Sequence, residues 1–284
     1  MIELESRYYQ TFPVDNPRGH TSERLTLDPA RTVFLLVDVY GIGFDPGYRN
    51  IDIPEFYRGQ VERSREIVVE HIVPAKKAAK SAGIPIVYLT NYLSPTLNER
   101  SEWRNLSLRV HGIDVLKAWQ EPNQILAYSD IIAPRSGEHV VKKQLYSGFY
   151  ETQLDSLLRS LDAYNLITVG FDSRICLATT VQDAMYRNYR VVVLRDCVGT
   201  AAEATGSASA DDERRRANEE AIRFIETNVG YTSTSRLWIE ACAAAGANTA
   251  AQPAPASGAR PERPSHPLQA RAQVPTPAAS SAHH

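Results

Sequence analysis

The chain has 284 residues, a hydrophobic fraction of 43% and a formal net charge of -2. This length and apolar content are enough to bury a sizeable core, in one large α/β domain or in two small ones. The near-neutral charge gives no indication of nucleic acid or of an anionic membrane as a partner, and no apolar run is long enough to predict a membrane span.

The three cysteines, Cys176, Cys197 and Cys242, form an odd and sparse set. Such usage is typical of a reducing compartment rather than of a disulfide framework. The first ten residues include acidic side chains and no continuous apolar stretch, so they do not resemble a secretory signal. We therefore expect a soluble protein of the cytoplasm.

Residues 1–30 are polar, interrupted by prolines, and carry aromatic side chains at Tyr8, Tyr9 and Phe12. We expect this N-terminal arm to pack on the surface of the domain or on a neighbouring subunit. The second alternative would make the protein a homo-oligomer, which size-exclusion chromatography with light scattering can test.

A near-continuous apolar run over 32–39 predicts a central strand of a parallel sheet covered on both faces. Its one charge, Asp38, comes at the carboxyl end, where open parallel sheets bind their ligands. Asp38 is therefore a candidate functional group, although it could equally cap the following turn.

The middle of the chain predicts one helix, one strand and two long loops. Residues 41–58 are predicted to form a loop, and an amphipathic helix over 60–82 is expected to kink or restart near Pro74. The strand 85–90 follows, and then an irregular region, 92–136. Long loops of this kind are usually functional, so we expect 92–136 to form a lid or a specificity wall.

Strands and helices alternate from His139 onward. The predicted strands are 139–143, 166–169, 190–194 and 230–235; the predicted helices begin at about Thr152 and Leu177 and cover 211–228 and 237–245. This alternation predicts βαβ crossovers and a doubly wound, parallel α/β sheet within a domain of residues 31–245. The remaining residues, 246–284, are rich in Ala and Pro without periodicity and are expected to be disordered.

Cys176 lies where the strand 166–169 gives way to a helix. Free backbone N–H groups and the positive end of the helix dipole would favour a thiolate there and could hold an oxyanion. The alternative is a buried cysteine that acts only as a small hydrophobic side chain.

Asp38, Lys143 and Cys176 each follow an apolar strand of the same predicted sheet. All three can therefore project from its carboxyl edge into one crevice, where a thiol, an acid and a cation would form a nucleophile, a base and an electrostatic partner. Lys143 could also be a surface lysine like its neighbour Lys142, but adjacent strand residues point to opposite faces.

These residues resemble the cysteine hydrolases of the isochorismatase-like superfamily. The resemblance is carried by the strand that ends in Asp38, the K-x-x-Y-S-G-F-Y segment 143–150, and Cys176 followed by its helix. Within the superfamily, the segment 142–160 looks most like the ureidoacrylate amidohydrolases. The resemblance implies six parallel strands with helices on both faces, Asp38, Lys143 and Cys176 as a triad, and a cis peptide bond between Phe171 and Asp172.

The expected mechanism is amide hydrolysis through a covalent Cys176 intermediate. Asp38 would take the thiol proton and return it to the leaving amine, while the N–H groups of Ile175 and Cys176 would stabilise the oxyanion. Lys143 is expected to hold Asp38 ionised and to lower the thiol pKa.

Polar side chains near the predicted edge are candidate substrate contacts: Tyr40, Asn91, Tyr146 and Arg174. Tyr40 stands where the family usually has Gln. Arg174 could meet a substrate carboxylate or pair with Asp172, and the internal pair is slightly favoured. The segment after Asp38 lacks the His ligands of the superfamily's metal-dependent members, so we predict no metal and no cofactor.

We therefore expect a metal-independent cysteine amidohydrolase that acts on a small ureido, carbamoyl or carboxamide compound and releases ammonia. Two alternatives remain open. The same triad could open a lactam or another cyclic amide, or the fold could serve as a non-catalytic binding or assembly module.

Overall fold

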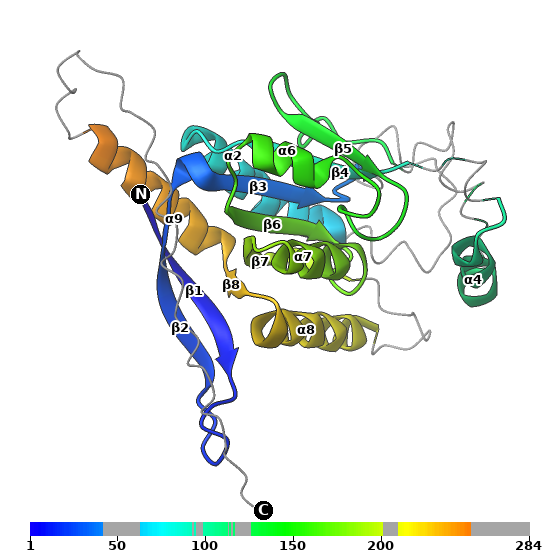
Figure 1. Cartoon of the computed structure of the whole chain (residues 1–284), viewed down its shortest axis with the longest axis horizontal. Helices are drawn as coiled ribbons and strands as arrows, with labels where there is room; N and C mark the ends of the chain where they lie inside the picture. The colour runs from blue at the N-terminus through cyan, green and yellow to red at the C-terminus, as the bar shows by residue number, and fades with distance from the viewer. Residues whose placement is uncertain are drawn as a thin grey trace, which may run out of the picture. The chain divides into compact units, whose positions relative to one another are not determined.

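The computed structural model describes residues 1–41, 63–92, 94, 99–112, 114, 116, 126–200 and 210–250 (Figure 1). One compact unit spans Met1–Ala251. Nearly all of the predicted loop 41–58, much of the predicted lid 92–136 and the tail beyond residue 250 lie outside the described residues, so the predictions made for them stay untested.

The described strands form one sheet in the order β2-β1-β8-β7-β6-β3-β4-β5. Their bounds are β1 Ile2–Gln10, β2 Gly19–Leu27, β3 Thr32–Val37, β4 Ile86–Asn91, β5 His139–Lys143, β6 Asn165–Phe171, β7 Arg190–Gly199 and β8 Tyr231–Ser233. Every pairing from β8 to β5 is parallel, as predicted for six strands. The other two strands are antiparallel and were not predicted.

The N-terminal arm is a β-hairpin that packs on the domain, which is the first of the two predicted alternatives, although its two strands were not predicted. β1 and β2 pair antiparallel from Ile2 opposite Leu27 to Gln10 opposite Gly19, and β1 joins β8 with Arg7 opposite Thr232. The first residues of β1 alternate between buried and exposed positions. This period of two is the ordinary pattern of a strand with one buried face.

The hairpin is fastened to helix α8 (Ala210–Asn228) through Glu226, whose side chain is fully buried. Arg7 donates to one carboxylate oxygen at 2.8 Å, and His20 Nε2 lies 3.1 Å from the other. Thr232 of β8 also donates to Glu226. The hairpin therefore packs on its own domain.

Helices cover both faces of the sheet (Figure 1), which confirms the doubly wound α/β class. On one face lie η3 Val68–Ile72, α2 Val73–Ser81 and α9 Ser235–Ala250; on the other lie α6 Leu154–Ser160, α7 Cys176–Tyr186 and α8. Phe34 and Leu36 of β3 enter the first core, whereas Val33 and Leu35 enter the second. This alternation explains why the whole strand is apolar.

Two helix boundaries refine the sequence prediction or differ from it. Helix α2 begins one residue before Pro74, after the π-helical turn η3, as expected for a helix that restarts at a proline. Helix α9 continues to Ala250, five residues beyond the predicted end of the domain. None of the helices in the described ranges is long and apolar enough to cross a membrane.

The predicted lid contains a helix that the sequence analysis missed, α4 (Glu102–His111). The Ser101 side chain caps its start by accepting a hydrogen bond from the Arg104 N–H at 3.2 Å, and Gly112 ends it in the left-handed conformation. Ser before the first turn and Gly after the last are ordinary helix boundary signals.

Candidate active site

Three polar side chains meet at the carboxyl edge of the sheet, as predicted from the strand ends. Asp38 directly follows β3, Lys143 is the last residue of β5, and Cys176 is the first residue of α7 after β6. Asp38 and Cys176 are each 8% exposed, and Lys143 is fully buried. The sheet therefore brings an acid, a cation and a thiol together in a nearly dry environment.

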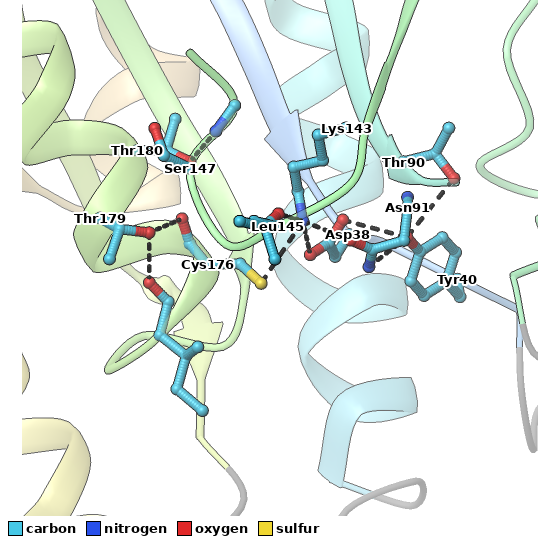
Figure 2. A network of polar contacts seen from close by, with 12 residues as sticks. Asp38, Tyr40, Thr90, Asn91, Lys143, Leu145, Ser147, Cys176, Thr179 and Thr180 are labelled. Atoms are coloured by element: carbon cyan, nitrogen blue, oxygen red, sulfur yellow. Dashed lines mark hydrogen bonds and ion pairs between the residues drawn. The ribbon is translucent and has the colours of Figure 1, made fainter. Parts of the chain in front are cut away.

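The Lys143 ammonium lies between the other two groups (Figure 2). Its Nζ is 2.9 Å from Asp38 Oδ2 and 3.4 Å from Cys176 Sγ. It also donates to Asn91 Oδ1 at 2.6 Å and to the Leu145 carbonyl at 3.2 Å. An ammonium has only three N–H bonds for these four acceptors, so at least one bond is shared or the partners exchange.

The neighbouring residues Lys142 and Lys143 point to opposite faces of β5. Lys142 is exposed, and its Nζ lies over the Tyr92 ring, 5.6 Å from the ring centroid. Lys143 is buried on the opposite face of the same strand. The alternation of strand side chains thus aims one lysine at the candidate site and the other at the surface.

Tyr40 and Asn91 lie on the far side of Asp38 from the thiol (Figure 2). The Tyr40 hydroxyl is 3.0 Å from Asp38 Oδ1. Asn91 donates to the same hydroxyl oxygen from its backbone N–H at 2.8 Å and from Nδ2 at 3.1 Å. Both residues were predicted as substrate contacts; the structure places their polar atoms against the acid and the cation.

Burial sets the resting protonation of the site. Burial first, and then the Asp38 charge, raise the pKa of the Cys176 thiol well above its ordinary value, and Lys143 offsets only part of this. The lowering of the thiol pKa expected from Lys143 is therefore present, but burial and the Asp38 charge outweigh it. Burial alone would lower the pKa of Lys143, but Asp38 and Cys176 outweigh it, so the pKa of Lys143 is raised.

The turn before the nucleophile is organised by Asp172, and the Phe171–Asp172 peptide bond is cis, as the resemblance implied. The Asp172 carboxylate accepts from the Arg174 backbone N–H at 2.8 Å and from the Thr200 hydroxyl at 2.9 Å. The Asp172 carbonyl accepts from the N–H of Ile175 at 3.1 Å.

Only one of the two predicted oxyanion donors is available in this geometry. The Ile175 N–H is already donated to Asp172. Within the described ranges the Cys176 N–H donates to no acceptor, and it stands at the first position of α7, where backbone donors have no partner inside the helix. An oxyanion role for these groups stays a prediction.

Arg174 and Tyr146 lie apart from the Asp38 carboxylate network. The exposed Arg174 guanidinium forms no ion pair with Asp172 in the described part of the chain, so the favoured internal pair between their side chains was wrong. Tyr146 accepts a hydrogen bond from Trp103 Nε1 of α4 at 2.9 Å, and the two rings meet edge to face. Helix α4 therefore contacts the segment that follows Lys143.

A glycine fixes how closely β6 approaches the acid. Gly170 has φ +121, and a Cβ at this position would lie 2.0 Å from the Val37 carbonyl oxygen, next to Asp38. Only glycine combines this backbone conformation with such a close approach. The sequence analysis assigned no role to Gly170.

No group of three or more His, Cys, Asp or Glu side chains suited to a metal ion occurs among the residues that the structure describes. The prediction of a metal-independent site stays a prediction.

Comparison with known proteins gives a consistent family. The isochorismatase domain family model matches residues 51–220. The ureidoacrylate amidohydrolase RutB of Methylobacterium radiotolerans is 28% identical over 278 residues, covering 84% of this chain and 98% of the relative. The enzyme of the same name from Yersinia enterocolitica is 30% identical over 177 residues, covering 58% of this chain and 71% of the relative.

Solved structures share the fold. A cysteine hydrolase from Pseudomonas syringae pv. phaseolicola has a TM-score of 0.61 and 24% identity, covering 78% of this chain and 97% of the other. An isochorismatase family protein from Burkholderia thailandensis has a TM-score of 0.53 and 20% identity, covering 77% of this chain and 98% of the other.

Proposed function

Because the chain belongs to the isochorismatase family, we propose that it is a metal-independent cysteine amidohydrolase. Its substrate is a small ureido, carbamoyl or carboxamide compound, and its products are ammonia and an acid. The observation that carries the proposal is the position of the buried Lys143 ammonium, 2.9 Å from a carboxylate and 3.4 Å from a thiol. The ureidoacrylate amidohydrolases to which the chain is similar support the ureido class.

The resting nucleophile is a neutral thiol, because burial raises the pKa of Cys176. Asp38 takes the thiol proton as sulfur attacks the substrate carbonyl carbon, and the Cys176 N–H donates to the oxyanion that forms. Asp38 then gives the proton to the leaving nitrogen, the C–N bond breaks, and an acyl or carbamoyl group remains on sulfur. Asp38 next deprotonates a water molecule, and the hydroxide attacks the carbonyl carbon. The C–S bond breaks, the acid is released, and Asp38 returns the proton to the departing thiolate.

Lys143 stabilises the thiolate as it forms. The Leu145 carbonyl is its longest oxygen contact, at 3.2 Å, and it is uncharged, unlike Asp38. A developing sulfur anion at 3.4 Å competes well for that N–H bond, because hydrogen bonds to charged acceptors are stronger than those to neutral ones. In the resting site this ammonium N–H bond is therefore donated to the Leu145 carbonyl, and it is donated to the sulfur instead when the thiolate forms.

Arg174 is the proposed contact for an anionic end of the substrate. Its guanidinium is exposed, two residues before the nucleophile, and it has no ion-pair partner in the described ranges. A guanidinium binds a carboxylate through two parallel N–H bonds. Changing Arg174→Ala should raise KM for ureido acids and leave KM for neutral carboxamides unchanged, and equal effects on both classes would remove this role.

The decisive experiment measures ammonia release from ureidoacrylate, carbamoyl acids, biuret and simple carboxamides by the native chain and by Cys176→Ala. Mass spectrometry of the same mixtures, with lactams added to the panel, detects addition of water without ammonia. Release that disappears in Cys176→Ala supports the proposal, whereas water addition to lactams alone supports the cyclic-amide hydrolase. Substrate binding without either product would support a binding module.

Compartment and assembly are part of the same proposal. All three cysteines are free thiols, which suits the reducing cytoplasm. We also propose a homo-oligomer, for which the exposed Phe12 at the tip of the hairpin offers one apolar contact. Light scattering that shows only a monomer would remove the assembly proposal without affecting the activity.

A further inference from the structure

We propose that Tyr40, oriented by Asn91, is a positioning residue for the Asp38 carboxylate rather than a substrate contact. The inference rests on the proposed function, because it assigns Asp38 the proton transfers. It follows from a closed ring of four side chains, in which each hydrogen-bond direction can be assigned from the chemistry of the groups.

The orientation of Asn91 is fixed by Lys143. An ammonium can only donate hydrogen bonds, so the Asn91 atom 2.6 Å from Lys143 Nζ must be the amide oxygen. The amide nitrogen, Nδ2, then faces Tyr40 and donates to the hydroxyl oxygen at 3.1 Å. The buried lysine therefore decides what Asn91 offers to the tyrosine.

The direction of the Tyr40 hydrogen bond follows from Asn91. A hydroxyl has one proton and two lone pairs, and the Asn91 N–H groups occupy both lone pairs, at 2.8 Å and 3.1 Å. Thr90 Oγ1 lies near the same oxygen at a longer 3.4 Å. The Tyr40 proton is thus left for Asp38 Oδ1 at 3.0 Å. Burial and then the Asp38 charge raise the pKa of Tyr40 well above its ordinary value, so this proton stays in place.

The ring ties down both carboxylate oxygens. Tyr40 holds Oδ1, and Lys143 holds Oδ2 at 2.9 Å. With both oxygens held, the carboxylate cannot rotate, and its remaining lone pairs keep one direction towards the thiol. Tyr40 itself is supported by the Tyr128 ring, whose centroid lies 6.1 Å away.

The test compares Tyr40→Phe, which removes only the hydroxyl, with Tyr128→Phe. Tyr128 is the matched control, because its ring packs on Tyr40 while its hydroxyl lies outside the ring of four side chains. We expect Tyr40→Phe to lower kcat roughly 10- to 100-fold, as for a lost hydrogen bond to a charged group, with KM changed by less than about two-fold. Tyr128→Phe should keep both constants.

The pH dependence separates positioning from a merely structural role. A carboxylate that loses a hydrogen-bond donor is protonated more easily, so the acidic limb of the kcat/KM profile of Tyr40→Phe should move to higher pH. Asn91→Ala should act through the same ring. The fold-loss in kcat of the double variant Tyr40→Phe/Asn91→Ala should therefore be much smaller than the product of the two single fold-losses. A raised KM with unchanged kcat in Tyr40→Phe would mean that Tyr40 binds substrate, and the inference would be wrong.

A readout without substrate keeps this inference distinct from the proposed function. If the native chain turns over none of the compounds, the proposed function fails, but alkylation of Cys176 by iodoacetamide can still be followed against pH by mass spectrometry. In Tyr40→Phe the Asp38 charge loses a hydrogen-bond donor and acts more strongly on the nearby thiol. The pH midpoint of Cys176 alkylation should therefore be higher in Tyr40→Phe than in the native chain, whereas Tyr128→Phe should leave it unchanged. Coinciding midpoints for the native chain and Tyr40→Phe would overturn the inference.

Discussion

Lys143→Met tests whether the buried ammonium compensates the Asp38 charge. The substitution keeps an unbranched side chain of similar length and removes the charge. At the observed 2.9 Å and an effective dielectric constant of about 20, the attraction between the two charges is about 6 kcal/mol. Desolvation of the two ions opposes part of this, and removal of one partner from a buried pair usually costs about 3–5 kcal/mol.

Urea unfolding measures this cost, and Lys142→Met is its matched control. With a slope of about 3 kcal/mol/M, the unfolding midpoint of Lys143→Met should fall by about 1 to 1.7 M. Lys142 is exposed on the opposite face of β5, so Lys142→Met should change the stability by less than about 0.5 kcal/mol. Adding Asp38→Asn to Lys143→Met should recover part of the loss, since no charge is then left unpaired.

The pH dependence of the Lys143 contribution has a defined sign. Because the pKa of Lys143 is raised in the folded protein, its contribution is fully present below the unfolded lysine pKa of about 10.4 and is lost as the pH rises through the folded value. The difference between Lys143→Met and the native chain should therefore be constant from pH 7 to about pH 9. A stability of Lys143→Met equal to that of Lys142→Met would refute the reasoning.

Three further predictions follow from the fold and the site. Gly170→Ala should destabilise the protein by more than about 2 kcal/mol, because its Cβ would meet the Val37 carbonyl. Gly83 also has a positive φ but has open space around it, so Gly83→Ala should cost only about 1 kcal/mol. Thermal unfolding of the two variants measures this difference. Since the pKa of Cys176 is raised, its alkylation in the native protein should be slow at pH 7 and accelerate only well above the ordinary cysteine value of about 8.5, and rapid labelling at pH 7 in peptide mass spectra would contradict this. Truncation after Ala251 should leave the melting temperature and the turnover unchanged, because Met1–Ala251 forms a compact unit, and a large loss of turnover would give the tail a function.

The six parallel strands, and the meeting of Asp38, Lys143 and Cys176 at one sheet edge, could be predicted because their signals are local. Apolar runs mark strands such as β3 and β7, Asp38 directly follows β3, and Lys143 ends β5. A parallel sheet then brings these ends to one edge without any knowledge of distances. The choice of Lys143 over Lys142 combined the K-x-x-Y spacing of the family resemblance with the alternation of side chains along a strand.

The features that the sequence analysis missed depend on contacts between distant residues or on weaker patterns. The sign of the Cys176 pKa shift depends on how deeply the fold buries the thiol, and the sequence does not give this depth. The ring formed by Tyr40 and Asn91 needs the ends of β3 and β4 at hydrogen-bond distance. The hairpin β1–β2 and the helix α4 had readable signals, but aromatic residues and prolines in polar sequence masked them.

The attachment of the hairpin has a consequence for the order of folding. Arg7 and Glu226 are 219 residues apart in the chain. The strand with which β1 pairs, β8, is the last of the described strands in chain order. The hairpin leaves the ribosome before the rest of the domain, yet its docking site exists only when synthesis of the domain is nearly complete. Closing so large a loop is slow, and until then the edge of β8 is open to pairing with other chains. The ends of the domain thus join in a late step, during which the nascent protein is most exposed to aggregation.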